Sequence, residues 1–407
     1  MEITIIYQIF LIVFTLAFIL GAVANKTDFC TMGAVSDWVN MGDTNRMRSW
    51  MLALTTALII VLCMEYFGLV DMSLTTDNAK SNPPYRTTNF VWLRYIVGGF
   101  IFGIGMTMAS GCGNKTLIRF GAGNLKSLFV LLAISAGASL MMFTNFSYDV
   151  FLSWMGILSI DFAEYGISGQ HLSAIITGYS GAENSNIIHL TIGLLVASLF
   201  ALFIFRSKEF LKHQELLIAG VVVGMIVAGA WFVSAGFMGQ ELLEEAEMMD
   251  EIPYAIGAQS FTFVAPTAHM TQFATQGFNL NFLTFGIIAA LGVILGSFIY
   301  ALIAGKLRFE WFVSLKDFAN HIIGGFIMGI GGVLGMGCTI GQGITGASTL
   351  ALGSFMTLFS IIFGSALTMK YQYYRMLYED ESMFAAIITA MVEMKMLPAK
   401  LRKLEKL

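Results

Sequence analysis

Apolar residues are grouped into long runs along this chain, and polar residues lie mainly between the runs. Each run approaches the ~20 residues that an α-helix needs to cross a bilayer. Helices are the expected conformation, because an open strand in hydrocarbon would leave its backbone donors and acceptors unpaired. All five prolines fall between the runs, as expected for unbroken helices. The sequence predicts about nine spans, near residues 3–25, 49–70, 95–111, 127–146, 187–205, 216–234, 281–304, 322–337 and 350–369.

The composition supports a membrane protein. Hydrophobic residues make up 57% of the chain and charged residues only 12%, with a mean hydropathy of +0.76. Because about a quarter of the residues of a soluble domain are charged, most of this surface must face lipid. No basic tract suggests nucleic acid. Glu2 is the only charge before the first run, so we expect a retained first helix and not a cleaved signal.

The distribution of positive charge predicts the orientation. If the N-terminus lies outside, only Lys80, Arg86 and Arg94 of the 22 Lys and Arg residues also lie outside. The outside loops at residues 147–186 and 235–280 then contain no basic residue at all. Cytoplasmic loops are enriched in Lys and Arg. We therefore expect a multi-pass protein of the bacterial inner membrane, with its N-terminus outside and its C-terminus in the cytoplasm.

An internal repeat relates two of the runs. Residues 98–105 (GGFIFGIG) recur as residues 324–331 (GGFIMGIG), and Gly111-Cys112 recurs at the same spacing as Gly337-Cys338. The two copies belong to the third and eighth predicted spans, so they run in opposite directions. Inverted repeats of this kind are typical of secondary transporters, which predicts that the protein moves a small solute.

The repeat also predicts the domain organisation. We expect an all-α membrane protein with two inverted, pseudo-symmetric halves and short re-entrant helices. Residues 1–206 form the first half and residues 207–381 the second. Residues 382–407 form an amphipathic, basic tail that is expected to lie on the inner membrane surface.

Polar, glycine-rich stretches follow the repeated cysteines. Residues 113–116 read GNKT and residues 339–343 read TIGQG. Irregular backbone at membrane depth is tolerated where it lines a cavity or is covered by protein. A helix that resumes after such a stretch would point its N-terminal N–H groups inward and favour an anion. The alternative is that the repeat glycines only permit tight helix packing.

Three of the four cysteines share a sequence context. Cys30, Cys112 and Cys338 each follow a span and open a short segment containing Gly, Thr or Asn, which favours a common chemical task. Cys63 lies in the middle of a run and is expected to be a buried hydrophobe. A thiol is mostly protonated at neutral pH, so it is a weak, uncharged donor with a polarizable sulfur, suited to a sulfur anion. The chain has no C-x-x-C pair and no histidine spacing typical of zinc.

Three motifs carry a family resemblance: FCTMGAVSD at residues 29–37, SGCGNKTLIRFGAG at 110–123 and GMGCTIGQG at 335–343. They resemble the YeeE/YedE membrane family. The resemblance implies an hourglass-shaped helical protein that takes up thiosulfate and passes the ion along a pore by S–H hydrogen bonds from three cysteines. Those cysteines correspond to Cys30, Cys112 and Cys338. The family also implies a soluble sulfur-carrier protein as a cytoplasmic partner.

We therefore expect uptake of thiosulfate or a related sulfur anion by a protein that is not an enzyme. Cys338 is expected near the outer mouth, with Cys112 and Cys30 deeper or nearer the cytoplasm. No nucleotide-binding motif is present, and we expect no cofactor and no bound metal. The expected pathway residues are Cys30, Cys112, Cys338, Gly111, Gly113, Asn114, Gly337, Thr339 and Gln342.

Other functions remain open at this point. A membrane sulfurtransferase or redox protein would carry a persulfide on Cys112 or Cys338. A selenium compound is an alternative substrate. A soft-metal transporter would use thiolates and some of the 26 methionines. A purely structural role would not require paired cysteine motifs at repeated positions.

Overall fold

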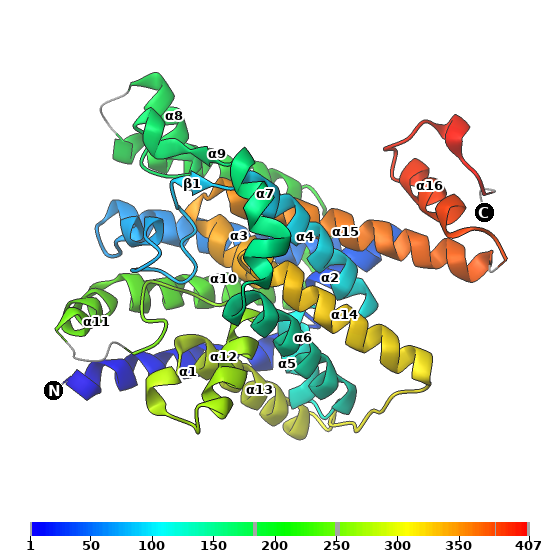
Figure 1. Cartoon of the computed structure of the whole chain (residues 1–407), viewed down its shortest axis with the longest axis horizontal. Coiled ribbons are helices and arrows are strands. Elements are labelled where there is room, and N and C mark those ends of the chain that lie inside the picture. Colours follow the sequence, from blue (N-terminus) through cyan, green and yellow to red (C-terminus); the bar gives the residue numbers. More distant parts are fainter. Residues whose placement is uncertain (1, 182–184, 249–252, 379, 405–407) are drawn as a thin grey trace.

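The protein is helical almost throughout (Figure 1). The computed structural model describes residues 2–181, 185–248, 253–378 and 380–404. Within these residues, nine helical segments are long and apolar enough to cross a membrane. The one sheet among them is a two-residue antiparallel pair, β1 (Asn89–Phe90) with β2 (Ile160–Asp161). The predicted all-α membrane fold with about nine spans is confirmed.

The spanning helices are α1 (Glu2–Lys26), α3 (Asn45–Tyr66), α4 (Trp92–Met108), α6 (Leu125–Phe143), α9 (Ser185–Phe205), α10 (Gln214–Ala235), α13 (Phe285–Ile303), α14 (Leu315–Leu334) and α15 (Leu352–Leu377). The shorter α-helices are α2 (Thr31–Ser36), α5 (Gly113–Gly121), α7 (Ser153–Met155), α8 (Leu172–Ser180), α11 (Phe237–Glu247), α12 (Ala265–Thr275) and α16 (Met383–Glu393). Single 3₁₀ or π turns are η1 (Asp37–Met41), η2 (Met72–Thr76), η3 (Tyr148–Leu152), η4 (Gly156–Leu158), η5 (Phe162–Tyr165), η6 (Phe210–Lys212), η7 (Leu280–Phe282), η8 (Gly341–Gly346), η9 (Ala347–Thr349) and η10 (Ala399–Leu401).

The two repeat helices, α4 and α14, pack directly against each other in opposite directions. Gly98 near the start of α4 lies against Gly335 just after α14, and Gly105 near the end of α4 lies against Gly324 near the start of α14. A Cβ atom added at Gly105 would come within 2.6 Å of the Gly324 carbonyl oxygen. Small residues of this kind let two helix backbones approach closely in a membrane. The repeat glycines therefore have a packing role, whatever else they do.

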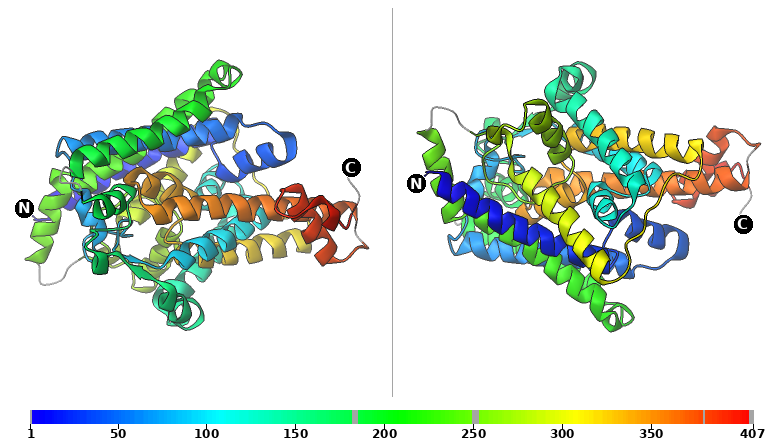
Figure 2. Two further views of the ribbon diagram at one scale, coloured as in Figure 1. Left: turned by 90° about the horizontal axis from the view of Figure 1, so that it is seen from above. Right: turned by 90° about the horizontal axis from the view of Figure 1, so that it is seen from below.

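Helices from the first part of the chain pack mainly on helices from the second. The most extensive contacts pair α4 with α15, α14 with α6, α1 with α13 and α3 with α10. In Figure 2, α1 and α13 run side by side. Corresponding repeat positions make corresponding contacts, since Gly99 lies against Thr357 of α15 and Gly325 lies against Val130 of α6. The division into two inverted halves stays a prediction.

The start of α1 and the end of α15 lie at opposite ends of the longest axis (Figure 1). The predicted tail folds back on the end of α15, where Glu393 of α16 pairs with Lys370 at 3.3 Å and with Arg402 at 3.0 Å. Residues 405–407 of this tail lie outside the described residues. Its position on a membrane surface stays a prediction.

Candidate functional site

Each of the three singled-out cysteines lies directly before the first residue of a short helix. Cys30 is the N-cap residue of α2 and Cys112 is the N-cap residue of α5. Cys338 precedes a helical segment that begins at Thr339 and continues into η8. The carbonyl of each cysteine accepts a hydrogen bond from the N–H four residues later, at 3.0, 2.9 and 2.7 Å respectively. Residues 113–116 and 339–343 were expected to be irregular backbone before a helix resumes, but they are helical themselves. That expectation was wrong, because the turn that ends the preceding span lies just before each cysteine.

The backbone makes the same unusual turn before all three cysteines. The residue two positions earlier has a left-handed conformation in each case, with φ of 51° at Asp28, 57° at Ser110 and 60° at Met336. Residues other than glycine rarely adopt positive φ, and such residues cluster at functional sites. The turn ends one helix and directs the next one, so that a thiol lies at the junction. Its threefold occurrence indicates a repeated structural device.

The three cysteines, called here the cysteine row, are buried. Cys30, Cys112 and Cys338 are 7%, 2% and 0% exposed. The Cys112 thiol lies beside the thiol of Cys30 and near the side chain of Thr339, whose hydroxyl oxygen has no hydrogen-bond partner among the described residues. The Cys338 sulfur accepts the Gly341 N–H at 3.4 Å and lies 4.0 Å from the Thr262 hydroxyl. The structure therefore brings together residues that are far apart in the sequence.

Two large cavities adjoin the cysteine row. The first, called here the basic cavity, has a volume of about 630 Å³ and includes Cys30, Lys306 just after α13, and His321 near the start of α14. The second, called the opposite cavity, has a volume of about 490 Å³ and includes Phe285 at the start of α13 and Val333 near the end of α14. Because they touch opposite ends of the same two helices, the cavities open toward opposite faces. Cys112 and Cys338 are buried, and Gly337, next to Cys338, lines the opposite cavity.

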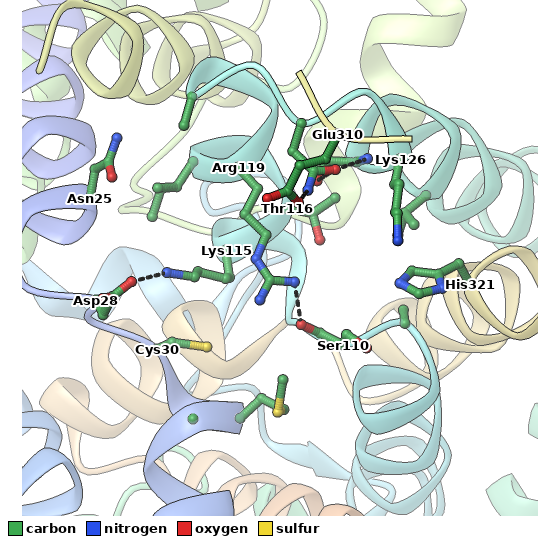
Figure 3. A pocket seen from close by; sticks show the side chains of 18 of the residues that line it. Asn25, Asp28, Cys30, Ser110, Lys115, Thr116, Arg119, Lys126, Glu310 and His321 are labelled. Atoms are coloured by element: carbon green, nitrogen blue, oxygen red, sulfur yellow. Dashed lines mark hydrogen bonds and ion pairs between the residues drawn. The ribbon is translucent and has the colours of Figure 1, made fainter. Parts of the chain in front are cut away.

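The basic cavity carries an excess of positive charge. Lys115 pairs with Asp28 at 2.8 Å, and Arg119 donates to the Ser110 carbonyl at 2.6 Å (Figure 3). Six basic side chains and three carboxylates line this cavity, so its field attracts anions. The basic residues are Arg46, Lys115, Arg119, Lys126, Lys306 and Arg308, and the carboxylates are Asp28, Glu310 and Asp317.

The opposite cavity has a different character. Arg94 lines it and donates from Nε to the Leu334 carbonyl at 2.9 Å. His269 is only 4% exposed, and its Nε2 atom has no partner among the described residues. Burial lowers the pKa of His269 to about 4, so the ring is neutral at pH 7. Arg94 is then the one charged group among the described lining residues.

The remaining predicted site residues lie around the cysteine row. Gly337 lines the opposite cavity, whereas Asn114 and Thr339 are buried. The Oδ1 atom of Asn114 has no partner among the described residues. The amide group of Gln342 donates to the Gly335 carbonyl at 2.8 Å and accepts from the Ser354 hydroxyl at 2.5 Å. Gln342 thus stabilises the segment that carries Cys338 through these two hydrogen bonds.

Glycines on either side of Cys112 bring the chain close to its neighbours. A Cβ atom at Gly113 would lie 3.2 Å from the Phe263 carbonyl oxygen, and one at Gly111 would lie 3.4 Å from the Lys115 side chain. A larger residue at Gly113 would press against the Phe263 backbone, whereas one at Gly111 would make an ordinary contact with the flexible Lys115 side chain. Gly113 therefore lets the start of α5 approach its neighbour closely.

Sequence comparison then decides the family. The profile of the sulphur transport family matches residues 26–367, which is most of the chain. The chain belongs to the sulphur transport family. One relative, named thiosulfate transporter TsuA, from Spirochaeta thermophila, is 26% identical over 358 residues, covering 86% of this chain and 94% of its own. A protein of the same name from Escherichia coli is 25% identical over 326 residues, covering 77% of this chain and 80% of its own.

Two residues that line the opposite cavity were not selected from the sequence. Arg94 was expected only as an outside charge, and His269 had no metal-ligand spacing to draw attention to it. Arg94 falls within two residues of the start of α4, a spanning helix of otherwise apolar character. That placement was the available clue. His269 gave none, because its burial depends on distant parts of the chain.

One expectation about the cysteines was wrong. Cys63 is exposed on the surface of α3, and not buried. The hydrocarbon of a bilayer is as apolar as a protein core, so a small apolar side chain gains nothing by burial there. Cys63 is thus separate from the other three thiols, which are all buried.

Proposed function

We propose that this protein takes up thiosulfate, or a closely related sulfur anion, across the bacterial inner membrane. The observation that carries the proposal is the placement of three buried cysteines, each at the start of a helix, with Cys30 lining one cavity and Gly337, next to Cys338, lining the other. Two relatives with the name thiosulfate transporter support the choice of ion. In this proposal the protein transports the anion chemically unchanged and is not an enzyme.

The residues of the row suit a dianion that ends in sulfur. The N–H groups at the starts of α2, α5 and the helix after Cys338 would offset negative charge. Protonated thiols donate weak S–H hydrogen bonds and present soft sulfur, which matches the terminal sulfur of thiosulfate. Sulfate has only oxygen at its surface. The thiols therefore provide selectivity, and the backbone groups provide charge compensation.

The proposed direction of transport follows from charge. The opposite cavity, with Arg94, would face outside, and the basic cavity would face the cytoplasm, as in the N-out orientation. The ion would meet Cys338 first, then Cys112 and Cys30. Basic side chains at the inner end would draw the anion inward. A soluble sulfur-carrier protein with an acidic surface would collect it there.

Radiolabelled thiosulfate uptake by cells that express single-cysteine variants tests the proposal. Cys30→Ala, Cys112→Ala and Cys338→Ala should each slow uptake by roughly tenfold, the rate effect of about 1.4 kcal/mol in a barrier. Cys63→Ala is the matched control and should transport normally, since Cys63 lies on the outer surface of α3. Normal uptake by all three pathway variants would contradict the relay.

Intact mass measurement separates transport from sulfurtransferase chemistry. A persulfide on Cys112 or Cys338 would add the mass of one sulfur atom after exposure to thiosulfate. The hydrogen-bond relay leaves every thiol unmodified. We therefore expect no mass change in the purified protein.

A further inference from the structure

A second cluster of ionisable groups lies outside the cysteine row. Glu65 is near the end of the spanning helix α3. Its two carboxylate oxygens accept hydrogen bonds from the Arg86 guanidinium at 2.6 and 2.8 Å. His189, in the spanning helix α9, lies 2.9 Å from Glu65 through Nε2. Its other ring nitrogen, Nδ1, is 2.5 Å from the Ser173 hydroxyl. Ionisable groups within spanning segments are costly, and they mark sites of ion or proton movement.

This cluster has access to solvent. A small cavity of about 130 Å³ is lined by Glu65, His171, Ser173 and His189, together with Thr177 and other residues. The rings of His171 and His189 meet edge to face at 5.9 Å. The Nδ1 atom of His171 is buried without a partner among the described residues. The cavity is therefore polar and incompletely satisfied.

The cluster is also connected to the segment that carries Cys338. Arg86 is 3% exposed and donates from Nε to the Thr349 carbonyl at 3.0 Å. Thr349 ends η9, which continues the chain from Cys338 through η8. The backbone of Leu172, next to His171, donates to the Leu350 carbonyl at 3.1 Å. Arg86 thus links Glu65 directly to this segment.

We propose that Glu65 and His189 form a proton-binding site that couples uptake of the anion to proton influx. The inference rests on the proposed function, because a dianion that enters a cell against a negative interior potential needs compensating positive charge. Histidine is the side chain whose charge ordinarily changes between about pH 5 and 8. With Glu65 and Arg86 already neutralising each other, a proton on His189 gives the cluster one net positive charge, which offsets one of the two negative charges of the ion.

The groups around His189 determine which hydrogen bonds change when the ring is protonated. The titratable or charged groups that face it are Glu65 and Tyr66 from α3, Arg86 from the segment after η2, and His171 at the start of α8. A neutral ring donates one hydrogen bond to Glu65 and accepts one from Ser173. A charged ring donates to both, so it competes more strongly with Arg86 for the Glu65 carboxylate. The hydrogen bond from Arg86 to the Thr349 carbonyl would then change in strength or geometry.

Purified protein in liposomes tests the coupling through a ratio of uptake rates. Radiolabelled thiosulfate uptake is measured with the outside about one pH unit more acidic than the inside, and again at equal pH. The wild-type ratio should be roughly threefold or more, and His189→Gln should reduce the ratio to about one. His213→Gln, which replaces an exposed histidine before α10, should keep the wild-type ratio.

A second measurement needs no variant. A pH dye inside wild-type liposomes should report acidification when thiosulfate is added outside at equal pH. Absence of acidification, a wild-type ratio near one, or an unchanged ratio in His189→Gln would overturn the coupling while leaving transport intact. Stimulation by a sodium gradient in place of the proton gradient would overturn it too. Failure of wild-type protein to take up thiosulfate under any condition would instead reject the proposed function.

Discussion

At the scale of single residues, backbone conformation fixes the positions of the three cysteines in the cysteine row. Asp28, Ser110 and Met336 all have positive φ, which costs on the order of 1–3 kcal/mol for each residue. Such strain persists because the surrounding structure holds it. In the proposed relay the thiols would therefore be in place before an ion arrives, and little ordering would remain to be done on binding.

Buried histidines should make stability depend on pH. Burial lowers the pKa of His269 from 6.5 to about 4, so the unfolded chain binds this proton more readily than the folded protein. Stability should fall as the pH drops from about 6.5 toward 4, by on the order of 3 kcal/mol from this group. Burial lowers the pKa of His171 as well, and adds to the effect. Thermal unfolding in detergent at several pH values measures this loss of stability.

The matched variants for this prediction are His269→Gln and His213→Gln. Replacing His269 should reduce the loss of melting temperature on acidification, because a glutamine does not titrate. Replacing His213 should leave the loss unchanged, since that side chain is exposed. Equal acid sensitivity in wild type and His269→Gln would contradict the buried, neutral histidine.

At the scale of elements, long apolar runs were predictable and short buried helices were not. The nine spans follow from hydropathy. Helix α5 has nine residues and buries Asn114 and Lys115, so no hydropathy window detects it. The three cysteines could be selected from their repeated context. The Glu65–Arg86–His189 cluster could not, because its members come from separate elements and share no spacing.

The contact between α4 and α14 should be sensitive to a single methyl group. At Gly105, an added Cβ would lie 2.6 Å from backbone atoms of α14, which cannot move independently of their helix. Gly105→Ala should destabilise the protein by about 1–3 kcal/mol. Gly229→Ala is the control, because its Cβ would lie 3.4 Å from a flexible Leu16 side chain. Melting temperatures in detergent compare the two, and equal values would refute the close contact.

At the scale of the whole molecule, nine spans among the described residues put the start of α1 and the end of α15 on opposite faces. The prediction is an outside N-terminus and a cytoplasmic C-terminus. A green fluorescent protein fused after Leu407 should therefore fluoresce, whereas alkaline phosphatase fused there should be inactive. Alkaline phosphatase fused after Glu164, in an outside loop, should be active. The reverse pattern would invert the orientation and exchange the faces of the two cavities.

The crossed pairing of helices limits how this molecule can move. Neither the first nor the second predicted half of the chain forms a separate body that can rotate or slide past the other. Helices of the two halves are packed together in the pairs α1 and α13, α3 and α10, α4 and α15, and α6 and α14. Glycine-to-backbone contacts would have to separate along several interfaces at once. We therefore expect an ion to pass through small local side-chain and backbone movements, without a large rotation of one half of the protein against the other.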